Sequence, residues 1–173
     1  MKPVIAVFGS GKVKPENPAY QFAFEVGREL ALAGFDICNG GYGGAMEAAA
    51  KGAKEARGKT IAIVAEEMRG TPNRWMDEIQ TVATWRERLF ALIDRVQGYV
   101  VLDGATGTLV EFMTVWELTS KKLLSKPVVM AGENILALFH YLTQREEFKV
   151  TDWLQQASDP KDIVKILKAK LKQ

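Results

Sequence analysis

The chain has 173 residues, 47% of them hydrophobic and 25% charged, which suits one water-soluble domain spanning residues 1–173. Its formal net charge of +2 gives no basic field of the kind that nucleic-acid-binding proteins use, so we expect no nucleic-acid partner. With a single cysteine, Cys38, and a single histidine, His140, it has neither a disulfide framework nor a cluster of ligands for a structural metal, and we expect both residues to pack in or near the core.

Short, continuous apolar runs recur along the chain and predict strands that are buried on both faces of a parallel sheet. The first run, at residues 4–9, is too brief for a signal sequence or a membrane span, so we expect a cytoplasmic protein with no membrane partner. The other runs lie at residues 35–38, 60–64, 99–102 and 127–130, and a weaker candidate lies at 79–83.

Helical periodicity appears between the apolar runs. Apolar residues at helical spacing predict helices at residues 46–53, 85–96, 109–116, about 134–146 and about 159–171. Asp159 suits the N-cap of the last helix, and Pro160 suits its first position. Strand, helix and strand in series predict an α/β fold, a doubly wound, Rossmann-like parallel sheet with helices on both faces.

Glycine-rich turns follow three of the expected strands, at the sheet edge where ligands of doubly wound proteins collect. Free backbone N–H groups and the positive end of a helix attract an anion at such a turn, and phosphate is the natural ligand. Tight bends also use glycine, but two such loops in one small domain favour a ligand. The candidate phosphate- and nucleotide-binding residues are Gly9 and Ser10 in the first turn, Gly40, Gly41, Gly43 and Gly44 in the second, and Gly104, Thr106, Gly107 and Thr108 in the third.

Two charged residues near these turns have ordinary structural interpretations. Glu111 stands three residues after Thr108, the spacing of a capping box in which the threonine caps a helix and the glutamate bonds back to it. Arg88 lies on an expected helix beside Arg86 and Glu87, where spacing alone suits a solvated surface charge. On the residue pattern alone, neither side chain is singled out as catalytic.

The chain resembles the LONELY GUY family of lysine-decarboxylase-like phosphoribohydrolases, whose relatives include molybdenum-cofactor carrier proteins. The family signature Pro-Gly-Gly-x-Gly-Thr-x-x-Glu is similar to residues 103–111, and the family loop Gly-Gly-Gly-x-x-Gly-x-Met is similar to residues 39–46. An arginine that the family places fifteen residues before its signature falls on Arg88. Departures are Asp103 in place of the signature proline, Ala105 in place of a glycine and Leu89 in place of a lysine.

The resemblance implies a homodimer, or an oligomer of dimers, that hydrolyses the N-glycosidic bond of a nucleoside 5′-monophosphate to a free base and ribose 5-phosphate. Gly104, Gly107 and Thr108 would hold the phosphate. Arg88 and Glu111 would flank the sugar as catalytic residues, with the arginine keeping the Glu111 carboxylate ionised. The resemblance implies no metal or cofactor other than a bound nucleotide, phosphate or molybdopterin-type ligand.

The departures leave other functions open. Asp103 would either repel a monophosphate or hold a metal-bound or sugar-hydroxyl group, and Ala105 limits the freedom of its loop to adopt a positive φ. The alternatives to a hydrolase are a molybdenum-cofactor carrier and a non-catalytic nucleotide-binding protein. The irregular segment 65–80 could serve as a base-recognising lid, a subunit contact or an ordinary surface loop.

Overall fold

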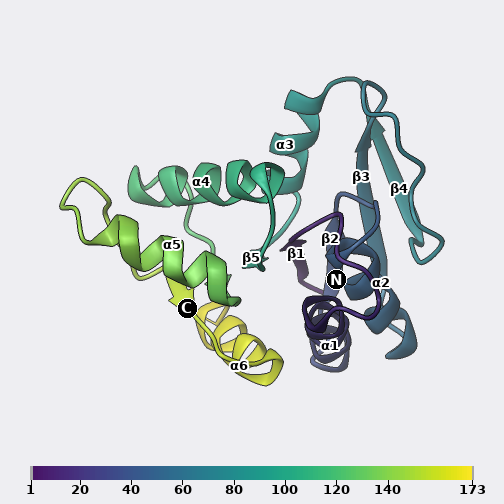
Figure 1. Ribbon diagram of the computed structural model, residues 1–173, viewed down its shortest axis with the longest axis horizontal. Helices are drawn as coiled ribbons and strands as arrows, with labels where there is room; N and C mark the ends of the chain where they lie inside the picture. The colour runs from purple at the N-terminus through teal and green to yellow at the C-terminus, as the bar shows by residue number, and fades with distance from the viewer. Residues whose placement is uncertain (1, 173) are drawn as a thin grey trace.

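A seven-stranded parallel sheet organises the computed structural model, which describes residues 2–172 (Figure 1). The strand order is β4-β3-β2-β1-β5-β6-β7. Connections run to one side from β1 and to the other side from β5, so the central β1–β5 pair is the switch point at which such sheets bind ligands. The strands are β1 (Val4–Phe8), β2 (Asp36–Asn39), β3 (Thr60–Ala65), β4 (Glu78–Val82), β5 (Gly98–Val101), β6 (Val128–Met130) and β7 (Leu154–Gln156).

Helices cover both faces of the sheet, and each face has its own apolar core. Helices α1, α2 and α6 pack with one core cluster, and α3, α4 and α5 pack with the other. Figure 1 shows these two groups on opposite sides of the strands. The helices are α1 (Pro18–Leu32), α2 (Ala45–Glu55), α3 (Trp85–Asp94), α4 (Thr106–Ser120), α5 (Glu133–Thr143) and α6 (Pro160–Lys170). The expected doubly wound α/β fold is confirmed.

The burial of each strand explains how clearly its sequence predicts it. Every residue of β3 and β5 is buried, as their unbroken apolar runs indicate. The edge strand β4 alternates between half-buried and exposed residues, which is why residues 79–83 gave the weaker signal. Glu78 on this strand pairs with Lys59 and Arg95, and charges of this kind protect an exposed sheet edge from pairing with another chain.

Two elements are absent from the sequence prediction. Helix α1 begins after Asn17, whose side chain accepts a hydrogen bond from the Ala19 N–H, with Pro18 at the first position. Strand β7 is three residues long and buries Leu154 alone, so the sequence contains no apolar run that would predict it. By contrast, Asp159 caps α6 as expected, accepting from the N–H groups of Lys161 and Asp162.

The only cysteine and the only histidine of the sequence lie in different environments. Cys38 is fully buried in β2, as expected, and burial raises the pKa of its thiol to about 12, so it is unreactive at neutral pH. The expectation that His140 packs in or near the core is wrong, because it lies on the exposed side of α5 with its Nε2 2.8 Å from the Gln156 Oε1. No helix in residues 2–172 is both long and apolar enough to cross a bilayer.

Candidate active site

A cleft of about 170 Å³ opens beyond the carboxyl ends of β1 and β2, beside the start of α4. The three glycine-rich turns all reach it, so the expected convergence is present in the structure. The residues that line the cleft are Gly9, Gly11, Tyr42, Met46, Met68, Trp85, Arg88, Leu89, Ala105, Gly107, Thr108 and Glu111.

Arg88 is a buried residue of α3, only 6% exposed, although its neighbours Arg86 and Glu87 face solvent. Its Nε donates to the Ile63 carbonyl oxygen at 2.9 Å, and its guanidinium lies 5.6 Å from the centre of the Tyr42 ring. A side chain at Gly40 would overlap this guanidinium, so glycine is required there to make room for it. The surface-charge interpretation of Arg88 is wrong, because the side chain turns inward and is held from three sides.

Glu111 projects from α4 into the same cleft. The helix begins at Thr106 with Ala105 as its N-cap, which places Thr108 inside the first turn and leaves it no capping role. The capping-box interpretation of Glu111 is therefore wrong. A capping box does exist one helix earlier, between Thr84 and Glu87 of α3.

The electrostatics of the Arg88–Glu111 pair depend on burial more than on attraction. The Arg88 Nη1 lies 3.8 Å from the Glu111 Oε1, close enough for an ion pair but too far for a hydrogen bond. The Glu111 side chain is 14% exposed, and burial raises its pKa to about 7 while Arg88 lowers it in part. The expected dominance of the arginine is wrong, since loss of solvation outweighs it. A carboxyl that titrates near neutrality suits general acid–base chemistry.

The glycines of the third turn have different reasons to be glycine. A side chain at Gly104 would overlap that of Thr108, so Gly104 keeps the turn tight. A Cβ at Gly107 would meet no heavy atom within 4 Å, so no packing in the protein requires glycine there. Neither residue has a positive φ, and Ala105 is extended with a φ of −95°, so the expected conformational limit from Ala105 does not arise.

Gly9 of the first turn lines the cleft, whereas the four glycines of the second turn shape that turn and do not line it. Gly41 and Gly44 adopt positive φ values of 77° and 65°, and the Gly41 N–H donates to the Asn39 Oδ1 at 2.8 Å. Ser10 joins the turns, since its N–H donates to the Asp103 carbonyl and its own carbonyl accepts from the Ala45 N–H. The candidates outside the cleft lining are Ser10, Gly40, Gly41, Gly43, Gly44, Gly104 and Thr106.

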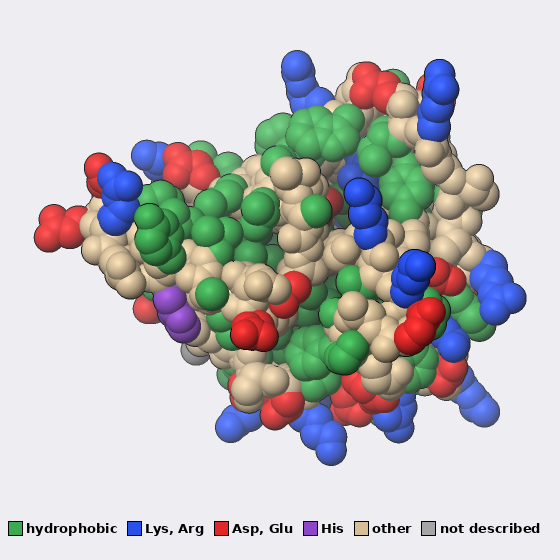
Figure 2. Space-filling model, viewed as in Figure 1, with side chains coloured by type: hydrophobic (Ala, Val, Ile, Leu, Met, Phe, Trp, Pro, Cys, Tyr) green, Lys and Arg blue, Asp and Glu red, His purple; other side chains and the backbone are tan. Residues whose placement is uncertain are grey.

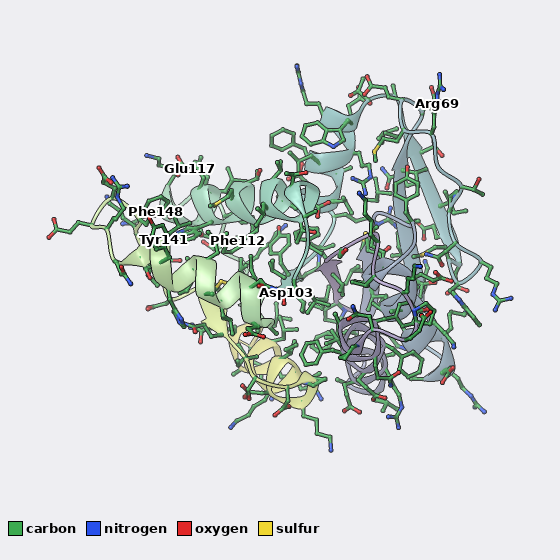
Figure 3. All side chains as sticks on the ribbon, in the orientation of Figure 1. Arg69, Asp103, Phe112, Glu117, Tyr141 and Phe148 are labelled. Carbon is green, nitrogen blue, oxygen red and sulfur yellow. The ribbon has the colours of Figure 1, made fainter. Side chains whose placement is uncertain are left out.

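Asp103 is occupied with the next helix. Its Oδ1 accepts from the Ile135 N–H at 2.8 Å and its Oδ2 from the Asn134 side chain at 3.3 Å, so it caps α5 from a distant part of the chain. Figure 3 shows it beside the first turn of that helix. Asp103 does not line this cleft, although it lines a neighbouring hollow of about 410 Å³.

The cleft contains several side chains that sequence reasoning missed, namely Tyr42, Met46, Met68, Trp85 and Leu89. Met68 comes from residues 66–77, the irregular part of the segment 65–80, whose two ends belong to β3 and β4. Asn73 fastens these residues over the second turn. The Asn73 side chain donates to the carbonyl oxygens of Gly41 and Tyr42 at 2.9 and 2.8 Å. Within residues 2–172, no group of three or more His, Cys, Asp or Glu side chains could hold a metal ion.

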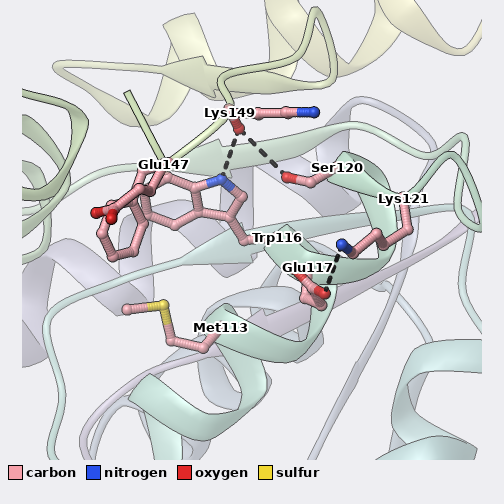
Figure 4. Close-up of a pocket in the computed structure, with 8 residues that line it drawn as sticks. Met113, Trp116, Glu117, Ser120, Lys121, Glu147 and Lys149 are labelled. Carbon is pink, nitrogen blue, oxygen red and sulfur yellow. Dashed lines mark hydrogen bonds and ion pairs between the residues drawn. The ribbon is translucent and has the colours of Figure 1, made fainter. Parts of the chain in front are cut away.

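Two other hollows lie outside this cleft, one beside the start of α5 and one beside α4. One, of about 410 Å³, lies between α1 and the start of α5 and is walled largely by apolar residues such as Phe22, Leu102 and Leu136. The other, of about 210 Å³, lies between α4 and residues 147–149 (Figure 4). There the Trp116 Nε1 and the Ser120 hydroxyl both donate to the Lys149 carbonyl oxygen, at 2.9 and 3.2 Å. These bonds fasten the chain after α5 to α4, which is a structural role.

Comparison with known proteins agrees with this architecture. The model of the SLOG cluster4 family matches residues 2–162. A cytokinin riboside 5′-monophosphate phosphoribohydrolase of Mycobacterium tuberculosis is 31% identical over 113 residues, which are 64% of this chain and 60% of that protein. The molybdenum cofactor binding protein of Rippkaea orientalis is 26% identical with a TM-score of 0.76, covering 98% of this chain and 97% of its own. The molybdenum cofactor carrier protein of Chlamydomonas reinhardtii is 25% identical with a TM-score of 0.75 and covers 100% of both chains.

Proposed function

From the premise that the chain belongs to the SLOG cluster4 family, we propose that it is a nucleoside 5′-monophosphate phosphoribohydrolase. It would hydrolyse the N-glycosidic bond and release a free base and ribose 5-phosphate. The observation that carries the proposal is the buried Arg88–Glu111 pair, 3.8 Å apart, in a cleft reached by three glycine-rich turns. The similarity to a phosphoribohydrolase supports it.

The first turn of α4 is the proposed phosphate site. The free N–H groups and positive end of the helix favour an anion there, and Gly107 leaves space for it. From Thr106 to Glu111 the helix rises about 7.5 Å, a span comparable to that between the phosphate and the anomeric carbon of a ribose 5-phosphate. Because Gly107, Thr108 and Glu111 line the same cleft, a phosphate at the turn would bring the sugar within reach of the Glu111 carboxyl.

The proposed chemistry follows from this placement. As the bond from the anomeric carbon to the base breaks, its electron pair leaves with the base and positive charge develops on the sugar. The Glu111 carboxylate accepts a proton from the attacking water, whose oxygen bonds to the anomeric carbon, and that proton can pass to the departing base. Arg88 partly offsets the rise that burial causes in the pKa of Glu111, which favours the carboxylate form that the reaction needs.

The matched test compares two glutamates of α4. The wild-type protein is incubated with AMP, IMP, GMP and CMP, and the free base is measured by chromatography. We expect Glu111→Gln to lower kcat at least about 100-fold while AMP still binds, the loss typical of a missing general base. Glu117→Gln is the control, because Glu117 lies on the exposed side of α4, and we expect no change. Release of no base from any nucleotide would overturn the proposal.

We also propose a homodimer formed through α3 and α4. Phe90 and Val110 expose apolar surface on these helices, and Figure 2 shows apolar atoms grouped over α3. Apolar patches of this kind mark contacts between subunits, and a two-fold arrangement would cover the patch on both copies. Light scattering should give twice the chain mass, and Phe90→Asp should give one chain mass.

A second candidate function is the binding of a phosphate-bearing pterin without turnover. The observation that favours it is the second cavity, of about 410 Å³, beside the same sheet edge, together with the similarity to molybdenum cofactor proteins. If this function holds, the purified protein binds an oxidised pterin phosphate at one saturable site and releases no base from nucleotides. Leu136→Trp, which fills that cavity, should then abolish pterin binding and leave AMP binding intact.

A further inference from the structure

Beyond the Arg88–Glu111 pair, the cleft is walled by aromatic, thioether and aliphatic side chains. These are Tyr42, Met46, Met68, Trp85 and Leu89. The Tyr42 hydroxyl oxygen is buried without a hydrogen-bond partner among the described residues, so in this structure the ring and not the hydroxyl is exposed to a ligand. Among these five residues, the Trp85 indole N–H and the weakly accepting thioethers are the polar groups that remain. This wall therefore offers flat apolar contact and almost nothing with which to read the edge of a base.

We infer that the protein recognises the base of its substrate by stacking and apolar contact, and so accepts nucleoside 5′-monophosphates with different planar bases. The inference rests on the proposed function, because it takes the phosphate to lie at the start of α4 and the sugar between Arg88 and Glu111. The base then lies against the aromatic and methionine side chains. Methionine adapts to ligands of different shape because its side chain is flexible and polarizable.

The position of Trp85 adds tolerance for larger bases. Trp85 precedes Arg88 and Leu89 by three and four residues on α3, so all three share one face of the helix. Trp85 is 42% exposed, whereas Arg88 and Leu89 are buried. The cleft therefore runs from a buried centre to an open mouth at Trp85, and a substituent on the outer edge of the base would extend toward solvent.

The expected selectivity follows from how pockets discriminate. A pocket that hydrogen-bonds a polar group rejects an analogue without that group by about 10⁴ to 10⁵, whereas an apolar pocket distinguishes small changes by roughly 10- to 200-fold. We therefore expect kcat/KM for AMP, IMP, GMP and N6-benzyl-AMP to lie within about 200-fold of one another. A preference above that limit for one base over the others would overturn the inference.

Binding measurements separate this inference from the proposed function. If no nucleotide releases its base, the hydrolase proposal fails. The inference is then tested by the Kd of each nucleotide for the Glu111→Gln variant, and Kd values that differ by more than about 200-fold between bases would overturn it. If hydrolysis occurs but one base is favoured beyond the limit, the inference fails and the hydrolase proposal stands.

A pair of variants at Met68 tests where the base lies. Met68→Leu preserves the apolar wall, so we expect the ratio of kcat/KM for AMP to that for IMP to be unchanged. Met68→Glu adds a carboxylate that accepts a hydrogen bond from the 6-amino group of AMP and repels the 6-oxo group of IMP, so we expect the ratio to rise at least about tenfold, the effect of one charged hydrogen bond. Equal ratios in the two variants would overturn the inference. If neither nucleotide is hydrolysed, the ratio of the Kd values for AMP and IMP is compared between the two variants instead.

Discussion

Replacing Gly107 by alanine separates a role in binding from a role in folding. Gly107 is in the first turn of α4 with no positive φ, and an added Cβ would meet no heavy atom within 4 Å. In a helix, alanine is favoured over glycine by about 0.5 to 1 kcal/mol, so Gly107→Ala should unfold at a slightly higher temperature than the wild type. The same methyl group enters the proposed phosphate site, where overpacking of about 1 to 3 kcal/mol corresponds to roughly 5- to 150-fold weaker AMP binding.

Calorimetric titration with AMP and thermal unfolding are measured on the same preparations of this variant. Gly104→Ala is the control, because a Cβ there would overlap the Thr108 side chain and should lower the unfolding temperature. The reasoning would be refuted if Gly107→Ala bound AMP as tightly as the wild type. It would also be refuted if this variant lost stability as Gly104→Ala should.

Three other variants test the electrostatics and the capping. Burial raises the pKa of Glu111 from 4.5 to about 7, so the stability that the neutral carboxyl provides is present below pH 4.5 and lost as pH rises to about 7. The wild type should lose about 3 kcal/mol of unfolding free energy relative to Glu111→Gln between these limits, measured by urea denaturation, and a pH-independent difference would contradict this. Arg88→Gln removes a group that lowers the same pKa, so the acid limb of the kcat/KM profile should move to higher pH, and a shift to lower pH would exclude the assigned role. Asp103→Ala removes the acceptor for the Ile135 N–H and should lower the unfolding free energy by about 1 kcal/mol without weakening AMP binding, whereas the reverse pattern would place Asp103 in the ligand site.

The elements that the sequence predicts are those whose burial is complete or whose caps are explicit. Strands β3 and β5 are buried along their whole length, so an unbroken apolar run identifies each of them. Strand β7 owes its place to pairing with β6 along three residues, and that pairing leaves no periodic signal in the chain. The start of α4 was misplaced because Thr106, Gly107 and Thr108 have weak helix propensity and the positive end of the helix lies over an open cleft.

The sequence likewise predicts some features of the candidate site and not others. Glycine-rich turns after parallel strands predict a ligand edge, and the parallel sheet brings those turns together. Arg88 lies on the apolar face of α3 that Leu89 and Leu92 define, so the helical spacing itself places it inward. The surface-charge interpretation rested on the charged residues next to it in the sequence. The aromatic and methionine wall was missed because such residues in a helix or loop normally indicate packing, and only the fold shows that Met68 and Trp85 meet across a cleft.

The Arg88–Glu111 pair is the feature for which the fold supplies no reason. A separation of 3.8 Å makes no hydrogen bond, and a buried ion pair without good geometry seldom recovers the cost of removing both charges from water. Burial raises the pKa of Glu111 more than Arg88 lowers it, so the neutral form is favoured more than in water. Glycine at position 40 makes room for the arginine, and glycine at position 107 leaves open space beside the glutamate. A buried acid that gains little from its partner and faces open space is better explained by a ligand that it acts on than by the stability of the fold.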